Sequence, residues 1–170
     1  MAGTQDEKIR QRRLVFYKDD VDRIEAHLSN FLSIAKAKCS LLIDKDGHLV
    51  TGSGSTSSYD TDTVSALVAG SFAATKQMAK LLGEEEFSVM FHQGKKDNIQ
   101  LTLVGDRTIL AVIFDGATTL GMIRHYATKL AERLAQVFDE IAERKGEPTE
   151  KLSAGFGDEA KGKLEAMFGE

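Results

Sequence analysis

The sequence predicts an α/β fold in which three helices and five strands follow one another in the order α-β-β-α-β-β-β-α. Apolar residues recur at helical spacing in three long segments, and five short β-prone runs lie between them. Glycine-containing turn sequences separate neighbouring runs. A chain of 170 residues with 42% apolar residues is long enough to bury a core of its own, so one globular domain is expected.

The first helix is predicted to begin at Asp19 or Asp20, because either side chain can act as the N-cap, and to end near Lys36. Apolar residues at intervals of three and four give this helix one buried stripe. The stripe consists of Val21, Ile24, Leu28, Phe31, Leu32 and Ala35.

A β-hairpin is predicted next, with strands over residues 39–44 and 48–52. The Asp46-Gly47 pair between them is a strong signal for a tight turn, because glycine adopts positive φ without a steric penalty. Residues 52–58 are small and polar, which predicts a flexible loop that leads into the next helix.

The second helix, over residues 61–82, has small or apolar residues on more than one side. One face is predicted to be buried and carries Val64, Leu67, Val68, Ser71, Thr75, Met78, Ala79 and Leu82. A second row has almost no side-chain bulk and consists of Ala66, Gly70, Ala73 and Gln77. Another backbone can approach such a row closely, so we interpret it as a recognition surface. The alternative is a helix wholly buried by its own protein, since small residues also serve ordinary close packing.

Three β-prone runs after the expected C-terminal glycine of this helix, Gly83, predict a strand meander. They cover residues 87–92, 98–104 and 108–114, with short glycine-containing connections between them. A last helix begins at a cap formed by Thr118 or Thr119. Its stripe consists of Leu120, Ile123, Ala127, Leu130, Leu134, Val137 and Ile141.

The domain is expected to cover residues 14–146, after a basic, mobile N-terminal lead over residues 1–13. Residues 147–170 are predicted to form a linker, marked by Pro148, and a short C-terminal segment that binds a partner. That segment presents Leu164, Met167 and Phe168 and is too short to be stable as an isolated helix. A disordered terminus with a few apolar residues is the alternative interpretation.

The overall composition excludes several classes of protein. A net charge of −4 and a pI near 5.6 argue against nucleic-acid binding, which needs clustered lysine and arginine. The single cysteine, Cys39, excludes an internal disulfide and fits a reducing compartment. No apolar run is long enough to cross a bilayer, so stable membrane insertion is not expected. A cytoplasmic location is expected instead.

No motif for catalysis or metal binding stands out. The four histidines lie far apart and show no zinc-ligand spacing with Cys39, and no complete phosphate-binding loop is present. Arg107 and Arg124 are the candidates for an arginine finger, but one follows a turn and the other lies early in a helix, so neither is well placed. No catalytic residue, metal or cofactor is therefore expected.

Five segments in this order carry a resemblance to a known family. They are residues 41–47 (LLIDKDG), 67–70 (LVAG), 79–84 (AKLLGE), 91–94 (FHQG) and 112–115 (VIFD). Over roughly residues 14–142 the chain resembles the Roadblock (dynein light-chain) family, and within it the MglB-like proteins. The resemblance implies a Roadblock-type α/β sandwich, a five-stranded, mainly antiparallel sheet with helices on both faces.

The resemblance also implies a homodimer. In this family the third strand, residues 87–94 here, pairs with its symmetry mate, which satisfies an otherwise unpaired strand edge. The residues expected at the dimer interface come from this strand and from the second helix. They are Phe87, Val89 and Phe91 in the strand, and Val68, Ser71 and Thr75 in the helix.

The expected partner is a Ras-like small GTPase of the MglA type, whose GTP hydrolysis MglB-like proteins accelerate. The GTPase would bind the row Ala66, Gly70, Ala73 and Gln77, with Lys76 and Lys80 at its border and the C-terminal segment as a further contact. The resemblance implies no inserted arginine finger and no catalytic site in this chain. It further implies a role in bacterial cell polarity and gliding motility, with concentration at a cell pole as one expectation.

Two other functions stay open from the sequence. A Roadblock scaffold would bind a GTPase or a motor complex without changing its turnover. A small-molecule sensor would need a cavity with convergent polar groups, and the sequence shows no such cluster.

Overall fold

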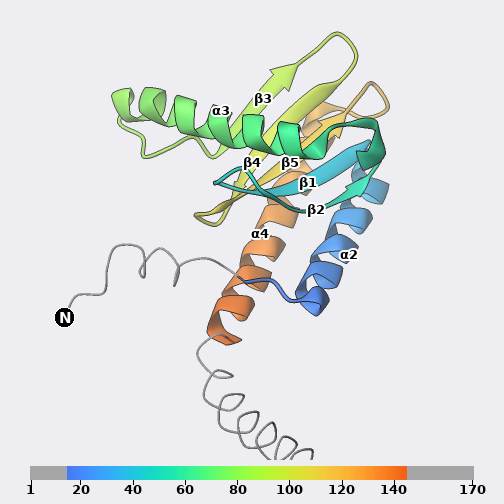
Figure 1. Cartoon of the computed structure of the whole chain (residues 1–170). Coiled ribbons are helices and arrows are strands. Elements are labelled where there is room, and N and C mark those ends of the chain that lie inside the picture. Colours follow the sequence, from blue (N-terminus) through green and yellow to red (C-terminus); the bar gives the residue numbers. More distant parts are fainter. Residues whose placement is uncertain (1–14, 145–170) are drawn as a thin grey trace, which may run out of the picture. The chain divides into compact units, whose positions relative to one another are not determined.

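The computed structural model describes residues 15–144, and it confirms the predicted order of helices and strands (Figure 1). The elements are α2 (Lys18–Ala35), β1 (Cys39–Asp44), β2 (Leu49–Gly54), the short 3-10 helix η1 (Thr56–Ser58), α3 (Thr61–Leu81), β3 (Val89–Gln93), β4 (Asn98–Val104), β5 (Thr108–Phe114) and α4 (Leu120–Arg144). Both predicted domain ends, residues 14 and 146, lie outside the described residues, so that boundary stays a prediction.

Residues 17–136 form one compact unit that contains the whole sheet. The described remainder, residues 15–16 and 137–144, belongs to a second unit. Within that second unit the rings of Phe16 and Phe138 meet edge to face, with 5.7 Å between their centroids. The first unit carries the candidate site.

The sheet has five strands in the order β2-β1-β5-β4-β3, and every neighbouring pair is antiparallel. In the unit of residues 17–136, α3 lies over one face of the sheet, and α2 and the first part of α4 lie over the other (Figure 1). Strands β1 and β5 are buried on both faces along almost their whole length, which explains why β5 is an unbroken apolar run after its first residue. This arrangement confirms the predicted sandwich.

Strand alternation decides which side chains meet α3. Successive strand residues point to opposite faces, so Leu41 and Ile43 face α3 while Leu42 points to the other side. The core under α3 consists of Cys39, Leu41, Ile43, Val68, Phe72, Leu101, Ile109, Ala111 and Ile113. Burial of these side chains supplies the main stabilisation of α3 on the sheet.

Three sequence predictions about local structure were wrong. Strand β3 begins at Val89 and not at residue 87, so Phe87 precedes the strand. The N-cap of α2 is Tyr17, and Asp20 lies at the third helical position, where its carboxylate accepts a hydrogen bond from the Tyr17 amide at 3.0 Å. Strand β2 extends to Gly54, because Gly54 still pairs with Cys39 of β1, so part of the predicted flexible loop is strand. Gly54 has φ +91° and lies against the Lys38 carbonyl oxygen, a position that only glycine can occupy.

The buried face of α3 is rotated from the predicted one. Leu67, Met78 and Leu82 were expected inside but are 67%, 55% and 73% exposed. The buried residues are instead Ser65, Val68, Ala69, Phe72 and Ala79. The error arose because small residues populate most sides of this helix, so hydrophobicity alone defines its inner face poorly.

Cys39 provides a test of the core by its pH dependence. Burial raises the pKa of its thiol from 9.0 to about 11. The unfolded chain therefore loses the proton first, and the free energy of unfolding should fall as pH rises through this window, by up to about 1.4 kcal/mol per pH unit. Chemical denaturation at pH 8 and 10.5 should show this additional loss in the wild type and not in Cys39→Ala. Equal losses in both proteins would contradict a buried thiol.

Candidate functional site

The candidate site is the outer surface of α3, and its first turn is held by a side-chain cap. Asp60 is the N-cap, and its carboxylate accepts hydrogen bonds from the Thr63 amide at 3.1 Å and the Thr63 hydroxyl at 2.7 Å. These hydrogen bonds hold the pKa of Asp60 below its usual value, and the one from the Thr63 hydroxyl contributes most. The cap satisfies amide groups that the helix itself leaves without partners, so the start of α3 is well defined.

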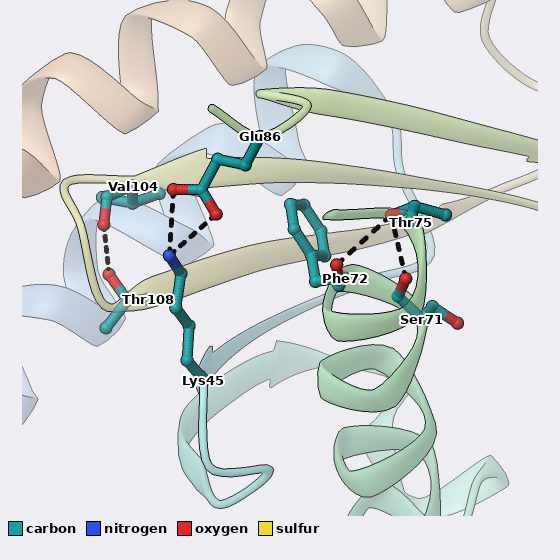
Figure 2. Close-up of polar contacts among 7 residues, drawn as sticks. All are labelled: Lys45, Ser71, Phe72, Thr75, Glu86, Val104 and Thr108. Atoms are coloured by element: carbon teal, nitrogen blue, oxygen red, sulfur yellow. Dashed lines mark hydrogen bonds and ion pairs between the residues drawn. The ribbon is translucent and has the colours of Figure 1, made fainter. Parts of the chain in front are cut away.

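The inner face of α3 fixes its rotation on the sheet. Val68 and Phe72 are both 5% exposed and belong to the core under the helix. One turn further on, the Thr75 hydroxyl donates to the Ser71 carbonyl at 2.9 Å and approaches the Phe72 carbonyl at 3.3 Å, as Figure 2 shows. The same hydroxyl lies 3.2 Å from the sulfur of Met90 in β3. The helix side that carries Ser71 and Thr75 therefore faces β3.

The predicted recognition row lies on the opposite, outer side of α3. All four residues, Ala66, Gly70, Ala73 and Gln77, are exposed. A Cβ atom added at Gly70 would meet nothing within 4 Å. Glycine in a helix interior destabilises it by roughly 1 kcal/mol relative to alanine, and the protomer gives no steric reason for a glycine here. A partner that packs closely on this row would supply one.

A second surface, the apolar flank, borders this row and is defined by Leu67, Met78, Leu81 and Leu82. These side chains are 67%, 55%, 87% and 73% exposed. Helical spacing places Leu67 and Met78 beside Ser71 and Thr75, on the side that faces β3. Large apolar side chains gathered on one helix flank are typical of a surface covered by another chain.

Strand β3 lies beside this flank. It is an edge strand of the sheet, and within the described part of the chain it pairs with β4 alone. Met90 faces α3, so Val89, which is 41% exposed, and Phe91 point to the opposite face of the sheet, where the Phe91 ring stacks on Phe114 with 6.1 Å between the centroids. An edge strand next to an apolar flank offers both backbone hydrogen bonds and apolar area to a second chain.

The six residues expected at the dimer interface differ in how far they are exposed in the protomer. Val89 is exposed, and Phe87, Phe91, Ser71 and Thr75 are partly buried. Val68 belongs to the protomer's own core, so little of its side chain is left for a partner. Their roles at an interface remain predictions.

The far flank of α3 is charged. Lys76 and Lys80 are exposed, as predicted for the border of the row. With Gly83, Glu84 and Glu85 they line a shallow, open depression of about 470 Å³. The recognition row thus lies between an apolar flank and a flank with charges of both signs.

The remaining sequence candidates do not come together with this surface. Among the described residues, no group of three or more His, Cys, Asp or Glu side chains is placed to hold a metal ion. None of the described helices is both long and apolar enough to cross a bilayer. The expected C-terminal contacts Leu164, Met167 and Phe168 lie outside the described residues.

Two features of this site were not predicted from the sequence. They are the anchoring of α3 by the buried Phe72 and the place of Leu81 in the exposed flank. Helical periodicity counted from Phe72, the largest apolar residue of the helix, would have located the buried side more accurately.

The chain is similar to known proteins of one family both in sequence and in structure. A family model for the Roadblock/LC7 domain matches residues 23–114. Three solved MglB structures are similar to this chain, each with a TM-score of 0.71 and covering 75% of this chain and 96% of its own. They are MglB from Myxococcus xanthus at 39% identity, the gliding protein MglB from Thermus thermophilus at 32%, and an MglB described with a tetrameric arrangement at 31%. No curated protein matched.

The cost of glycine in the recognition row can be measured directly. Gly70→Ala should raise the free energy of unfolding by about 1 kcal/mol, because helix propensity improves and the new Cβ meets open space. Ala73→Gly, one turn along the same exposed row, is the matched control and should lower it by a similar amount. Denaturant unfolding of both variants measures the difference. A destabilised Gly70→Ala protein would show that this position is crowded in the free protein.

Proposed function

This chain belongs to the Roadblock/LC7 domain family, and from that premise we propose that it is a homodimeric regulator that stimulates GTP hydrolysis by a Ras-like, MglA-type small GTPase. Similarity to MglB proteins over most of their length supports the broader part, a regulator of the MglB type connected with gliding motility. The family is one of regulators and scaffolds and not a catalytic fold. The single observation that carries the finer proposal is the exposed, nearly bulk-free outer row of α3.

The proposed dimer joins two copies through β3 and the apolar flank. Pairing β3 with its symmetry mate would satisfy its free edge, and the same contact would bring the Leu67 and Met78 sides of the two α3 helices together. The outer rows of both helices would then form one continuous surface. In this arrangement the flank is buried while Ala66, Gly70, Ala73 and Gln77 stay accessible.

The proposed GTPase contact uses this outer surface. Small side chains allow the switch regions of a GTPase to approach the α3 backbone, and Lys76 and Lys80 at the border would attract acidic groups. Activation would not need an acid, a base or an arginine from this chain. A regulator that binds the reactive conformation of the GTPase more tightly than the resting one shifts the population towards hydrolysis. The C-terminal segment is proposed as an additional contact.

Phosphate release tests the proposal against its scaffold alternative. The full chain is mixed with an MglA-type GTPase and excess GTP, and free phosphate is followed over time. The proposed function requires a rate well above that of the GTPase alone. Co-elution of the two proteins with an unchanged rate would favour the scaffold that binds without altering turnover.

Met78→Glu tests the dimer contact. A carboxylate buried without a partner costs several kcal/mol, so the dimer dissociation constant should rise at least a hundredfold, roughly. Because Met78 is 55% exposed in the protomer, the fold should persist. Sedimentation equilibrium measures the change. The neighbouring variant Gln77→Glu, on the outer row, should leave the dimer intact, and equal behaviour of the two would contradict the proposed geometry.

Ala73→Arg tests the GTPase contact. A long charged side chain on the row should abolish binding of the GTP-loaded GTPase, because it occupies the space that the partner needs, while the dimer stays intact. Pull-down or interferometry with immobilised GTPase measures it. Ser33→Arg, at an exposed position of α2, is the control that should still bind. Retained binding by Ala73→Arg would remove this row from the contact.

A further inference from the structure

The β1–β2 turn touches α3 and the segment that follows it at two separate points. At the first point, a Cβ atom on Gly47 would lie 3.2 Å from the Ala66 Cα atom, so the turn packs directly on the helix backbone. Gly47 also has φ +93°, which other residues rarely adopt. Glycine is therefore favoured here by its conformation, and the close approach to α3 leaves little room for a Cβ atom.

The second point is an ion pair just beyond the C-terminal end of α3. The Lys45 ammonium contacts both carboxylate oxygens of Glu86 at 3.0 Å, as Figure 2 shows. Both side chains are partly buried, with 31% and 23% of their surface exposed. Glu86 lies in the connection between α3 and the edge strand β3, so this contact ties the turn to the segment that links the two.

The Lys45 backbone adds a third connection. Its amide donates to the Arg107 carbonyl at 2.9 Å, in the turn between β4 and β5. That turn is itself closed by a hydrogen bond from the Thr108 hydroxyl to the Val104 carbonyl at 2.6 Å, which Figure 2 also shows. Lys45 is thus anchored to the sheet while its side chain reaches the α3–β3 connection.

We propose that Lys45 is a positioning residue for GTPase activation: through Glu86 it sets where α3 ends relative to β3, and so aligns the outer row with the dimer edge. This inference rests on the proposed function. Each protomer contributes one α3 and one β3 to the combined surface. A change in their relative position therefore alters the surface offered to the GTPase without changing any residue that contacts it.

The chain contains a matched control for this ion pair. Lys38 and Asp97 form a pair of the same length, 3.0 Å, with 28% and 37% exposure. It joins the residue before β1 to the β3–β4 turn, and neither residue belongs to α3 or to the α3–β3 connection. Partly exposed ion pairs contribute little to stability, so Lys45→Met and Lys38→Met should each lower the melting temperature by less than about 4 °C. Stability alone therefore cannot separate the two variants, whereas activity can.

The test compares phosphate release at saturating regulator. Lys45→Met should lower the maximal stimulated rate at least threefold, roughly, while Lys38→Met leaves it unchanged. The double variant Lys45→Glu, Glu86→Lys restores the ion pair in reverse and should recover most of the rate. Failure of this rescue would indicate a direct contact of Lys45 with the GTPase, and would overturn the positioning role. Equal losses in both methionine variants, or none in Lys45→Met, would also overturn it.

Hydrogen exchange separates this inference from the proposed function. In the free protein, amides of residues 79–86 should exchange faster in Lys45→Met than in the wild type, and Lys38→Met should not affect them. If the wild type fails to stimulate the GTPase, the proposed function fails, and the exchange data still decide whether Lys45 holds this segment. Unchanged exchange in Lys45→Met would overturn the inference whatever the GTPase result.

Discussion

The structure depends on the packing of α3 against one face of an antiparallel sheet. Val68 and Phe72 enter the core formed by β1, β4 and β5, and this contact selects which residues of a mostly small-residue helix point outwards. A rotation of α3 by one residue position would bring Leu67 towards the sheet and turn Phe72 out of the core that it fills, so the shape of this core, and not apolarity alone, selects the setting of the helix. The rotational setting of one helix therefore determines both surfaces that the proposed function uses.

Those two surfaces differ in chemistry, and the difference suggests different partners. The apolar flank continues into the free edge of β3, where a second copy can supply backbone hydrogen bonds and apolar area together. The outer row has little bulk and no charge, so it favours close approach with little desolvation of charged groups. The Lys45–Glu86 pair ties the β1–β2 turn to the connection between α3 and β3, and in the proposed role it sets the position of α3 relative to β3.

The order of elements, the bounds of three of the five strands, the Thr119 cap and the exposure of the small-residue row could all be predicted from the sequence. These features are local: periodicity, turn glycines and caps act within a few residues.

The inner face of α3 was assigned incorrectly, because Leu67, Met78 and Leu82 are as apolar as true core residues and only the sheet decides among them. The contacts of Lys45 with Glu86 and Gly47 with Ala66 join residues far apart in the sequence, and no local pattern predicts such pairings.

The central claim, that the outer row of α3 receives the GTPase, is tested most directly by the alanine methyl groups. With ¹³C-labelled alanine methyls, addition of a GTP-loaded MglA-type GTPase should shift or broaden the signals of Ala66 and Ala73. The methyls of Ala111 and Ala127, buried in the sheet and in α4, serve as internal references and should change little. Perturbation of methyls on other elements, with Ala66 and Ala73 unchanged in a complex that demonstrably forms, would contradict the account.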